Sequence, residues 1–312
     1  MTNFKTDNGL DISTLFNTVG INKVGHVHIN EHTYDFDEHA PKNHWLYAAF
    51  LGFQEYQKRY GNVSSFASIG TGAGIDAIGA YEIFHPQKIF LTDIHPQIPP
   101  IAQKNVEANV PEHVPVRSFK GDLCLPLIEN KITVDLVYAN IPNIPSDQPK
   151  FEAKDSASFY QKRNENCPEI FEKYLLTLQY LFLAEAKQVV NKGGAVIDAI
   201  GGRVPYKILE GLFVSNGYAF EELVGIFKIQ TEPNYILKSY AEVEQKYNVE
   251  FDFYKYEDAQ KYWLKIEDKK LGGPELKSEL QKYRINATHA YNEYIKNNQP
   301  FGHVVHILCG KV

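Results

Sequence analysis

The sequence predicts an α/β fold in which a mostly parallel sheet of seven strands is covered by helices on both faces. From residue 64 onward, short apolar runs alternate with longer segments of helical periodicity, which is typical of consecutive βαβ units. The apolar runs contain few polar residues, as expected for strands that are buried on both faces. The length of 312 residues allows one such domain together with an N-terminal addition and a cap-like insert before the last strand.

Residues 1–62 precede the first strand of this pattern and form the N-terminal addition. A partly alternating segment, VGHVHINEHTYDF, favours a short hairpin. Apolar side chains then recur at helical spacing from Trp45 to Tyr56, and Gly61 marks the end of that helix. We expect the helix to cover the core or the mouth of a pocket.

The core occupies residues 63–230, and its final strand follows in residues 303–312. In chain order, the expected strands are SSFASI, KIFLT, VPVRSFK, VDLVYA, AVIDAI, AFEELVGIFKIQ and HVVHILCG. The expected helices are IDAIGAYEIF, IAQKNVEANV, EIFEKYLLTLQYLFLAEAKQVVN and PYKILEGLFVSNG. Residues 231–302 are too many for a plain loop. We expect this insert to be a cap or a surface for homodimer formation.

The composition argues against several classes of function. A net charge of −6 and a pI near 6.0 do not suit nucleic-acid binding. The three cysteines form no CxxC pair and the histidines are not spaced as ligands, so neither a disulfide framework nor a metal site is expected. No apolar run reaches the roughly 18 residues of a membrane helix, and no signal-peptide pattern is present, which predicts a cytoplasmic protein without a membrane partner.

A glycine-rich loop joins the first expected core strand to its helix. The segment SIGTGAG places Gly70, Gly72 and Gly74 where a strand turns into a helix. Glycines there allow the backbone to approach a ligand at the positive end of the helix, which is typical of a nucleotide site. The pattern that ends at Ala77 also fits the fingerprint of NAD enzymes, and a tight turn without a ligand is the simplest alternative.

Two aspartates follow the next two strands. Asp93 ends the second strand, 19 residues after Gly74, where a carboxylate can accept hydrogen bonds from both ribose hydroxyls. Asp122 follows the third strand, at the height of an adenine. A solvated loop aspartate would explain either residue alone. Three features at the carboxyl ends of consecutive strands indicate a nucleotide site.

The segment VDLVYANIPNIP ends the fourth strand on Asn140. Because Pro142 and Pro145 prevent the strand from continuing its ladder, they hold the chain open as a rigid shelf. The Asn140 carboxamide oxygen and the Ile141 carbonyl are the hydrogen-bond acceptors of this shelf.

Taken in order, SIGTGAG, GDLCLPL and VDLVYANIPNIP resemble the motifs of the class I S-adenosylmethionine-dependent methyltransferases, whose fold is Rossmann-like. The sequence looks most like the branch that holds the release-factor glutamine methyltransferases, which reads Asp-Leu-Gly-Thr-Gly-Ser-Gly and Asn-Pro-Pro-Tyr-Ile-Pro at two of these motifs. The resemblance covers about residues 64–233. It implies that S-adenosylmethionine binds at the carboxyl edge of the sheet.

The resemblance also implies a role for each candidate residue. The residues expected to bind the cofactor are Gly70, Thr71, Gly72, Gly74, Asp93, Ile94, Asp122, Leu123 and Asn140. The residues expected to act in catalysis are Asn140, beside the sulfonium, and Tyr174. The residues expected to contact the substrate are Ile141, Pro142, Asn143, Tyr160 and Arg203. A structural role is the alternative for Tyr160, Tyr174 and Arg203.

Two positions depart from the pattern of that branch. Ser68 stands where the relatives carry an acidic residue, which weakens the usual anchor for the amino group of the cofactor. Asn143 stands where the relatives carry a tyrosine that stacks on a planar substrate. The loss of that ring favours a small, non-planar acceptor such as an amino acid.

These observations predict an enzyme that transfers a methyl group from S-adenosylmethionine to a nitrogen of a small molecule or amino acid by direct displacement. An alternative is intramolecular cyclisation of S-adenosylmethionine to azetidine-2-carboxylate, which releases methylthioadenosine. A NAD-dependent oxidoreductase and a non-catalytic scaffold are further alternatives. The oxidoreductase leaves residues 140–145 unexplained.

Overall fold

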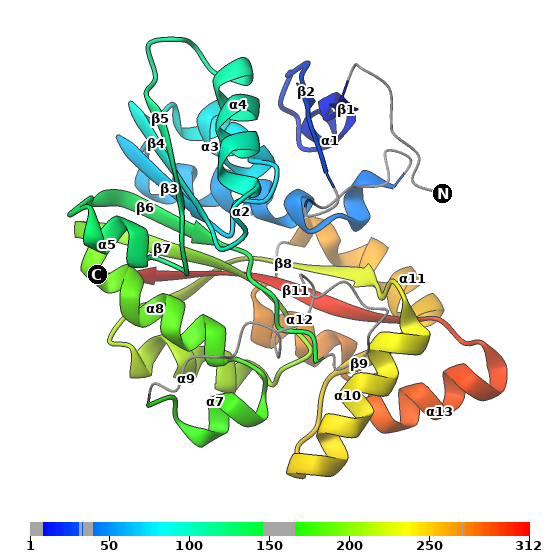
Figure 1. Cartoon of the computed structure of the whole chain (residues 1–312). Helices are drawn as coiled ribbons and strands as arrows, with labels where there is room; N and C mark the ends of the chain where they lie inside the picture. Colours follow the sequence, from blue (N-terminus) through cyan, green and yellow to red (C-terminus); the bar gives the residue numbers. More distant parts are fainter. Residues whose placement is uncertain (1–8, 31–32, 34–39, 146–165, 270) are drawn as a thin grey trace. The chain divides into compact units, whose positions relative to one another are not determined.

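The structure is a computed structural model that describes residues 9–30, 33, 40–145, 166–269 and 271–312 (Figure 1). The chain divides into two compact units. The first unit comprises Met1–Asn140, Glu185–Asp198 and Lys311–Val312. The second comprises Ile141–Ala184 and Ala199–Gly310. Tyr160, which the sequence assigns to the substrate, lies outside the described residues.

The first unit contains a parallel sheet with the strand order β7-β6-β3-β4-β5. Its strands are β3 (Ser65–Ile69), β4 (Lys88–Asp93), β5 (Val116–Lys120), β6 (Val134–Ala139) and most of β7 (Val190–Gly201). All five residues of the central strand β3 are buried, because strands flank it and helices cover it. Burial on both faces explains why this strand is apolar without alternation.

Helices of the first unit complete its core (Figure 1). They are α1 (Ser13–Thr18), α2 (Trp45–Tyr60), α3 (Ile75–Phe84), α4 (Ile98–Asn109), α5 (Leu125–Glu129) and the short 3₁₀ turn η1 (Pro41–Asn43). The predicted helix α2 inserts Phe53 against rings from the sheet and from α3. Its ring centroid lies 5.8 Å from that of Phe66, 5.5 Å from that of Phe84 and 4.9 Å from that of Tyr138. Helix α2 therefore covers the core, as expected.

The N-terminal segment forms a small separate sheet. Strand β2 (His26–Val27) pairs antiparallel with β1 (Leu10–Asp11). The predicted hairpin within VGHVHINEHTYDF is therefore wrong for β2, because its partner precedes it in the chain. Residues 31–32 and 34–36 of that segment lie outside the described residues.

The second unit contains the remaining strands, which are β8 (Ala219–Ile229), β9 (Phe253–Lys255), β10 (Arg284–Ile285) and β11 (Phe301–Lys311). Strand β9 pairs antiparallel with both β10 and β11, and β8 also pairs with β11. Besides the two-stranded β1–β2 pair, the described residues thus contain nine sheet strands, where the sequence predicts seven. The two additional strands, β9 and β10, come from the insert. The α/β class and the mostly parallel order are confirmed.

Helices account for most of the second unit. They are α7 (Glu169–Lys173), α8 (Thr177–Val189), which continues into the first unit, α9 (Tyr206–Ser215), α10 (Pro233–Tyr247), α11 (Tyr256–Ile266), α12 (Gly273–Leu280) and α13 (Ala287–Asn297), with 3₁₀ turns η3 (Glu267–Lys269) and η4 (Gln281–Tyr283). The single long helix expected before β7 is wrong, because it is broken between α7 and α8. Leu175 adopts a left-handed φ of 61° at the break, which no glycine or proline signals.

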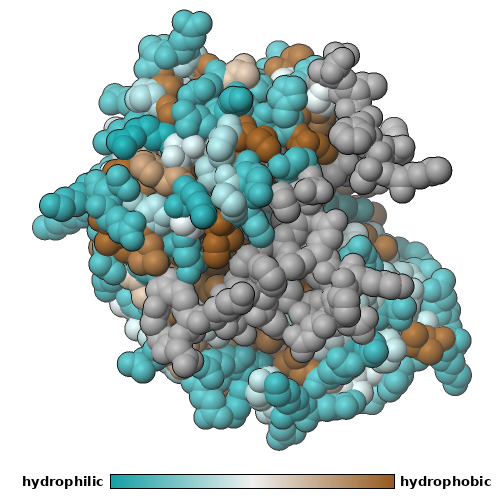
Figure 2. Space-filling model, in the orientation of Figure 1, coloured by the Kyte–Doolittle hydropathy of each residue, from teal (hydrophilic) through white to brown (hydrophobic). Residues whose placement is uncertain are grey.

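The surface of the described residues is largely polar on the face drawn in Figure 2, where hydrophobic residues form only small groups. Within the insert, Leu264 of α11 and Ile295 of α13 are both 58% exposed. Homodimer formation through the insert stays a prediction. No helix in the described part of the chain has the length and apolar character that crossing a membrane requires.

Candidate functional site

The glycine-rich loop turns from β3 into α3 through three left-handed glycines. Gly70, Gly72 and Gly74 have φ angles of 66°, 52° and 81°. A Cβ atom on Gly74 would lie 2.9 Å from Cγ2 of Val106 and 3.1 Å from the carbonyl oxygen of Ala102, so packing against α4 requires glycine there. A Cβ on Gly72 would meet nothing within 4 Å. The loop is therefore closed on its α4 side and open at Gly72.

Hydrogen bonds fix this loop to the end of β4. The backbone N–H groups of Gly70 and Thr71 both donate to the Thr92 carbonyl, at 2.9 and 3.0 Å. The N–H of Gly72 donates to Oδ2 of Asp93 at 3.2 Å, and the N–H of His95 donates to Oδ1 of the same carboxylate at 3.0 Å. The glycine loop and Asp93 thus lie together at the carboxyl edge of the sheet, as the sequence predicts.

Asp93 is only 8% exposed, and its burial raises the pKa of the carboxyl group. The hydrogen bonds from the His95 and Gly72 backbones oppose this shift, since they favour the charged form. Each carboxylate oxygen accepts one backbone bond and has a second lone pair. Asp93 can therefore accept hydroxyl donors while its own position stays fixed.

Thr71 carries an unsatisfied polar atom in the same loop. The residue is only 5% exposed, and its buried side-chain Oγ1 makes no hydrogen bond. Buried hydroxyl groups nearly always have a partner, so an orphaned one in a glycine loop needs an explanation. A polar ligand group that binds over the open Gly72 would supply that partner.

Sequence reasoning missed Asp76, in the first turn of α3. The Ser68 hydroxyl donates to Oδ2 of Asp76, and the N–H of Ala77 donates to Oδ1 at 2.8 Å. Asp76 is 3% exposed, and burial raises its pKa to about 7. The acidic group that the sequence lacks at position 68 is therefore supplied by Asp76 of α3, which is in direct contact with Ser68. An aspartate in the first turn of this helix was the available signal.

The predicted adenine residues also lie beside the end of β4. The Thr92 hydroxyl donates to the Leu123 carbonyl at 3.0 Å, and the N–H of Gly121 donates to the Asp93 carbonyl at 2.9 Å. Leu123 has a left-handed φ of 46°, which is unusual for its residue type. Ile94 is 40% exposed, so an apolar side chain is accessible just after Asp93.

Asn140 follows β6 at the same edge of the first unit. The preceding residue, Ala139, is paired with Ile69 of β3 and with Asp198 of β7. Asn140 therefore lies one residue beyond the paired strands, just as Gly70 does. It is partly exposed, and its side chain has no hydrogen bond to another described residue. Its carboxamide is available to a ligand.

The shelf continues into the second unit, where its backbone is already held. Nε2 of Gln179 donates to the Ile141 carbonyl at 3.1 Å, and the Tyr240 hydroxyl donates to the Asn143 carbonyl at 2.9 Å. Asn143 is 8% exposed and its Nδ2 is buried without a partner, whereas Pro142 is partly exposed. The Ile141 carbonyl keeps only one lone pair for a substrate.

Tyr174 directly follows α7, and its ring packs against another aromatic side chain. The ring centroid lies 5.6 Å from that of Phe251 in an edge-on arrangement. Partial burial raises the pKa of its hydroxyl. These contacts describe a packing residue, and a catalytic role for Tyr174 stays a prediction.

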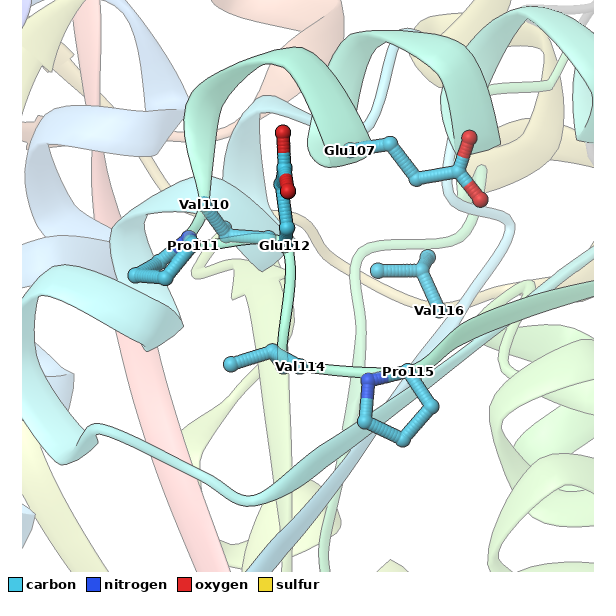
Figure 3. A pocket seen from close by; sticks show the side chains of 7 residues that line it. All are labelled: Glu107, Val110, Pro111, Glu112, Val114, Pro115 and Val116. Atoms are coloured by element: carbon cyan, nitrogen blue, oxygen red, sulfur yellow. The ribbon is translucent and has the colours of Figure 1, made fainter.

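A surface hollow of about 320 Å³ lies at the amino end of β5, opposite the carboxyl ends of the strands where the glycine loop lies (Figure 3). It lies between the end of α4 and the start of β5, and its lining residues are Glu107, Val110, Pro111, Glu112, Val114, Pro115 and Val116. Because it is at the amino end of β5, it is remote from the glycine loop. Its charged groups are two carboxylates, which gives no basis for assigning it to this site.

No group of three or more His, Cys, Asp or Glu side chains suited to a metal ion occurs within the described residues.

Comparison of the sequence with protein-family models and with curated proteins gave no match. Among solved structures, the chain is similar to a ribosomal protein L11 methylase from Lactobacillus delbrueckii subsp. bulgaricus, with 16% identity, 64% of this chain and 79% of that chain covered, and a TM-score of 0.41. A precorrin-6y C5,15-methyltransferase from Geobacter metallireducens has 10% identity, coverage of 85% and 86%, and a TM-score of 0.39.

A methyltransferase from Pyrococcus furiosus has 20% identity, coverage of 56% and 75%, and a TM-score of 0.38. These three structures all carry the name of a methyltransferase or methylase. At such identities and TM-scores the similarity does not identify a function, which must be argued from the residues of this chain.

Proposed function

We propose that this chain is an S-adenosylmethionine-dependent transferase that methylates a nitrogen of a small molecule or amino acid by direct displacement. The observation that carries the proposal is the hydrogen bond of 3.2 Å between the Gly72 N–H and the Asp93 carboxylate. It joins an open glycine turn and a ribose-binding acid at one edge of a parallel sheet, where nucleotide ligands bind in α/β folds.

The cofactor-binding residues divide by chemistry. The open backbone at Gly72 and the orphaned Thr71 hydroxyl suit the polar methionyl group. Asp93 suits the ribose hydroxyls because its position is fixed by two backbone donors. The exposed Ile94 and the region of Asp122 and Leu123 suit the adenine.

When bound, S-adenosylmethionine supplies a methyl group on a cationic sulfur, and the bond between them breaks as the acceptor nitrogen bonds to that carbon. The Asn140 carboxamide oxygen would accept an N–H of the acceptor and so turn its lone pair toward the methyl carbon. The excess proton of the product amine then passes to water. Because the leaving thioether is neutral, no acid is needed, and positioning by Asn140 is the chain's main contribution.

The cyclisation alternative rested partly on the missing acid at Ser68. Asp76 supplies a carboxyl group in contact with Ser68, so the local environment differs less from the methyltransferase pattern than the sequence indicates. No observation in the described residues favours cyclisation over methyl transfer. We therefore propose methyl transfer alone.

The test is incubation of the purified protein with S-adenosylmethionine, with and without a mixture of the common amino acids, followed by mass spectrometry of the small molecules. We expect S-adenosylhomocysteine and a methylated amine only when the mixture is present. Methylthioadenosine formed without an acceptor would instead establish cyclisation. Calorimetry gives the second check: binding of NAD without binding of S-adenosylmethionine would overturn the proposal.

A further inference from the structure

The second unit contains a buried guanidinium group that has no counter-ion among the described residues. Arg203, just after β7, is 5% exposed. Its Nε and Nη2 donate to Oε1 of Gln230 at 2.9 and 2.7 Å, and its guanidinium carbon lies 5.4 Å from the ring centroid of Tyr240. Arg203 forms no ion pair with any described acidic side chain. A buried charge is normally paired, so this arrangement is costly on its own.

Asp252, whose backbone is bonded to that of Arg203, does not compensate this charge. The backbone N–H of Asp252 donates to the Arg203 carbonyl at 2.6 Å. The Asp252 carboxylate, however, is bonded through Oδ2 to Lys277 at 2.7 Å and through Oδ1 to Arg284. The Asp252 carboxylate is thus already paired with two other cations.

His303 of β11 adds an unsatisfied donor next to Arg203. Its Nε2 lies 3.1 Å from Nη2 of Arg203. Because a guanidinium can only donate, Nε2 must accept, and the ring proton of the neutral imidazole must be on Nδ1. Burial and the Arg203 charge lower the pKa of His303 well below its usual value, in agreement with a neutral ring. Nδ1 is buried and has no acceptor.

Asn143 adds a second unsatisfied donor on the other side of the guanidinium. A Cβ atom on Gly201 would lie 2.3 Å from Nη1 of Arg203 and 3.7 Å from Oδ1 of Asn143, so both side chains converge on Gly201. The Asn143 Nδ2 is buried without an acceptor. Two residues beside Arg203 therefore each carry a buried donor without an acceptor, Nδ1 of His303 and Nδ2 of Asn143.

A carboxylate satisfies what this cluster lacks. It carries one negative charge and two acceptor oxygens, and it can accept from the Nη1 group of Arg203, since Nε and Nη2 are already bonded to Gln230 and His303. We infer that Arg203, with Asn143 and His303, forms a binding site for the carboxylate of a small molecule. Within the proposed function, on which this inference rests for the ligand's identity, the source is either the acceptor, which would then be an amino acid, or the methionyl carboxylate of the cofactor.

Propionate and propionamide are suitable probes, since they have similar size and differ in charge. In ligand-observed NMR titrations of the full chain, we expect the wild type to bind propionate at least about tenfold more tightly than propionamide, the scale of a charge-assisted hydrogen bond. Arg203→Met should abolish this preference. Asn143→Ala, which keeps the backbone carbonyl bonded to Tyr240, should weaken propionate binding several-fold.

Arg117→Met is the matched control, because Arg117 is exposed on β5 of the first unit, and it should change nothing. Calorimetry with S-adenosylmethionine separates the two sources. If Arg203→Met weakens cofactor binding about tenfold and propionate competes with the cofactor, the cofactor's carboxylate occupies the site. If cofactor binding is unchanged, the site serves the acceptor.

Equal binding of propionate by the wild type and Arg203→Met, or no binding by either, would overturn the inference. Neither result affects the proposed function, which fails if S-adenosylmethionine does not bind, is not consumed, or yields methylthioadenosine without an acceptor. Because Arg203→Met removes an uncompensated buried charge, we expect the variant to fold. Asn143→Ala gives an independent test.

Discussion

The carboxyl groups of Asp93 and Asp76 in the first unit and the guanidinium of Arg203 in the second unit differ in how well they are satisfied. Asp93 accepts two backbone N–H groups and Asp76 accepts a hydroxyl and a backbone N–H. Around Arg203, by contrast, the guanidinium has no counter-ion among the described residues, and Nδ1 of His303 and Nδ2 of Asn143 are orphaned. The two carboxyl groups of the first unit are thus held in place by the chain, whereas the cluster around Arg203 depends on something that binds.

This difference teaches how two kinds of ligand-binding group can be recognised. A cofactor that is bound in every turnover favours donors and acceptors fixed by the backbone, because fixed groups lose little freedom on binding. A site that selects a charged ligand must leave its recognition groups without partners inside the protein, since such a partner would compete with the ligand for the same hydrogen bonds. A buried charge without an internal partner is then a sign of a recognition site for an opposite charge.

Asn140→Ala gives the largest expected effect and tests whether the shelf acts in catalysis. We expect turnover to fall about a hundred-fold while cofactor affinity stays within a few-fold, because the carboxamide would position the acceptor nitrogen. Turnover is measured by S-adenosylhomocysteine formation and affinity by calorimetry. Asn297→Ala, at the exposed end of α13, is the control and should leave both quantities unchanged. Unaltered turnover in Asn140→Ala would remove Asn140 from the mechanism.

Asp93→Ala tests a carboxyl group that the chain holds in place and should have the next largest effect. Loss of a carboxylate that binds ribose hydroxyls should weaken S-adenosylmethionine binding by about ten- to a hundred-fold. Part of this loss would come from the Gly72 N–H, which then lacks its acceptor. Glu129→Ala removes an exposed carboxylate of the same unit and should not alter the dissociation constant. If calorimetry gave the same affinity for Asp93→Ala and the wild type, the ribose assignment would be wrong.

The sequence predicts the candidate site of the first unit better than the cluster around Arg203 because its information there is local. Helix α3 and strand β6 have the expected boundaries, and the loop, Asp93 and Asn140 meet because parallel strands place their carboxyl ends at one edge. Arg203 could be named from its place after β7, but His303 lies 100 residues further along the chain. Only the fold brings these two side chains together.

Other errors have equally physical causes. The break at Leu175 has no local signal, because a left-handed leucine is held by tertiary packing rather than by its own preference. Strands β9 and β10 pair within an insert in which helical periodicity dominates. Strands this short leave too few residues to show a strand pattern of their own. Asp76 was missed because the acid was sought at position 68 in the strand and not on the adjoining helix.

Asp76→Asn should have the smallest effect, and its sign follows from the raised pKa. Because the folded state holds the Asp76 carboxyl protonated up to about pH 7, while its ordinary pKa is 3.8, the folded chain binds more protons than the unfolded chain between these values. This group's contribution to stability is therefore fully present below pH 3.8 and is lost as the pH rises toward 7. Asparagine has no such proton to lose.

The free energy of unfolding of the first unit should thus fall less steeply with pH in Asp76→Asn, by up to about 1.4 kcal/mol per pH unit between pH 5 and 7. In a Trp263→Phe background, the fluorescence of Trp45 in α2 reports urea unfolding of the first unit alone, since the chain has two tryptophans. Glu129→Gln should retain the wild-type slope. Parallel slopes for Asp76→Asn and the wild type would mean that Asp76 is ionised in the folded chain, and the first unit would then hold a buried, unneutralised charge much as Arg203 does in the second.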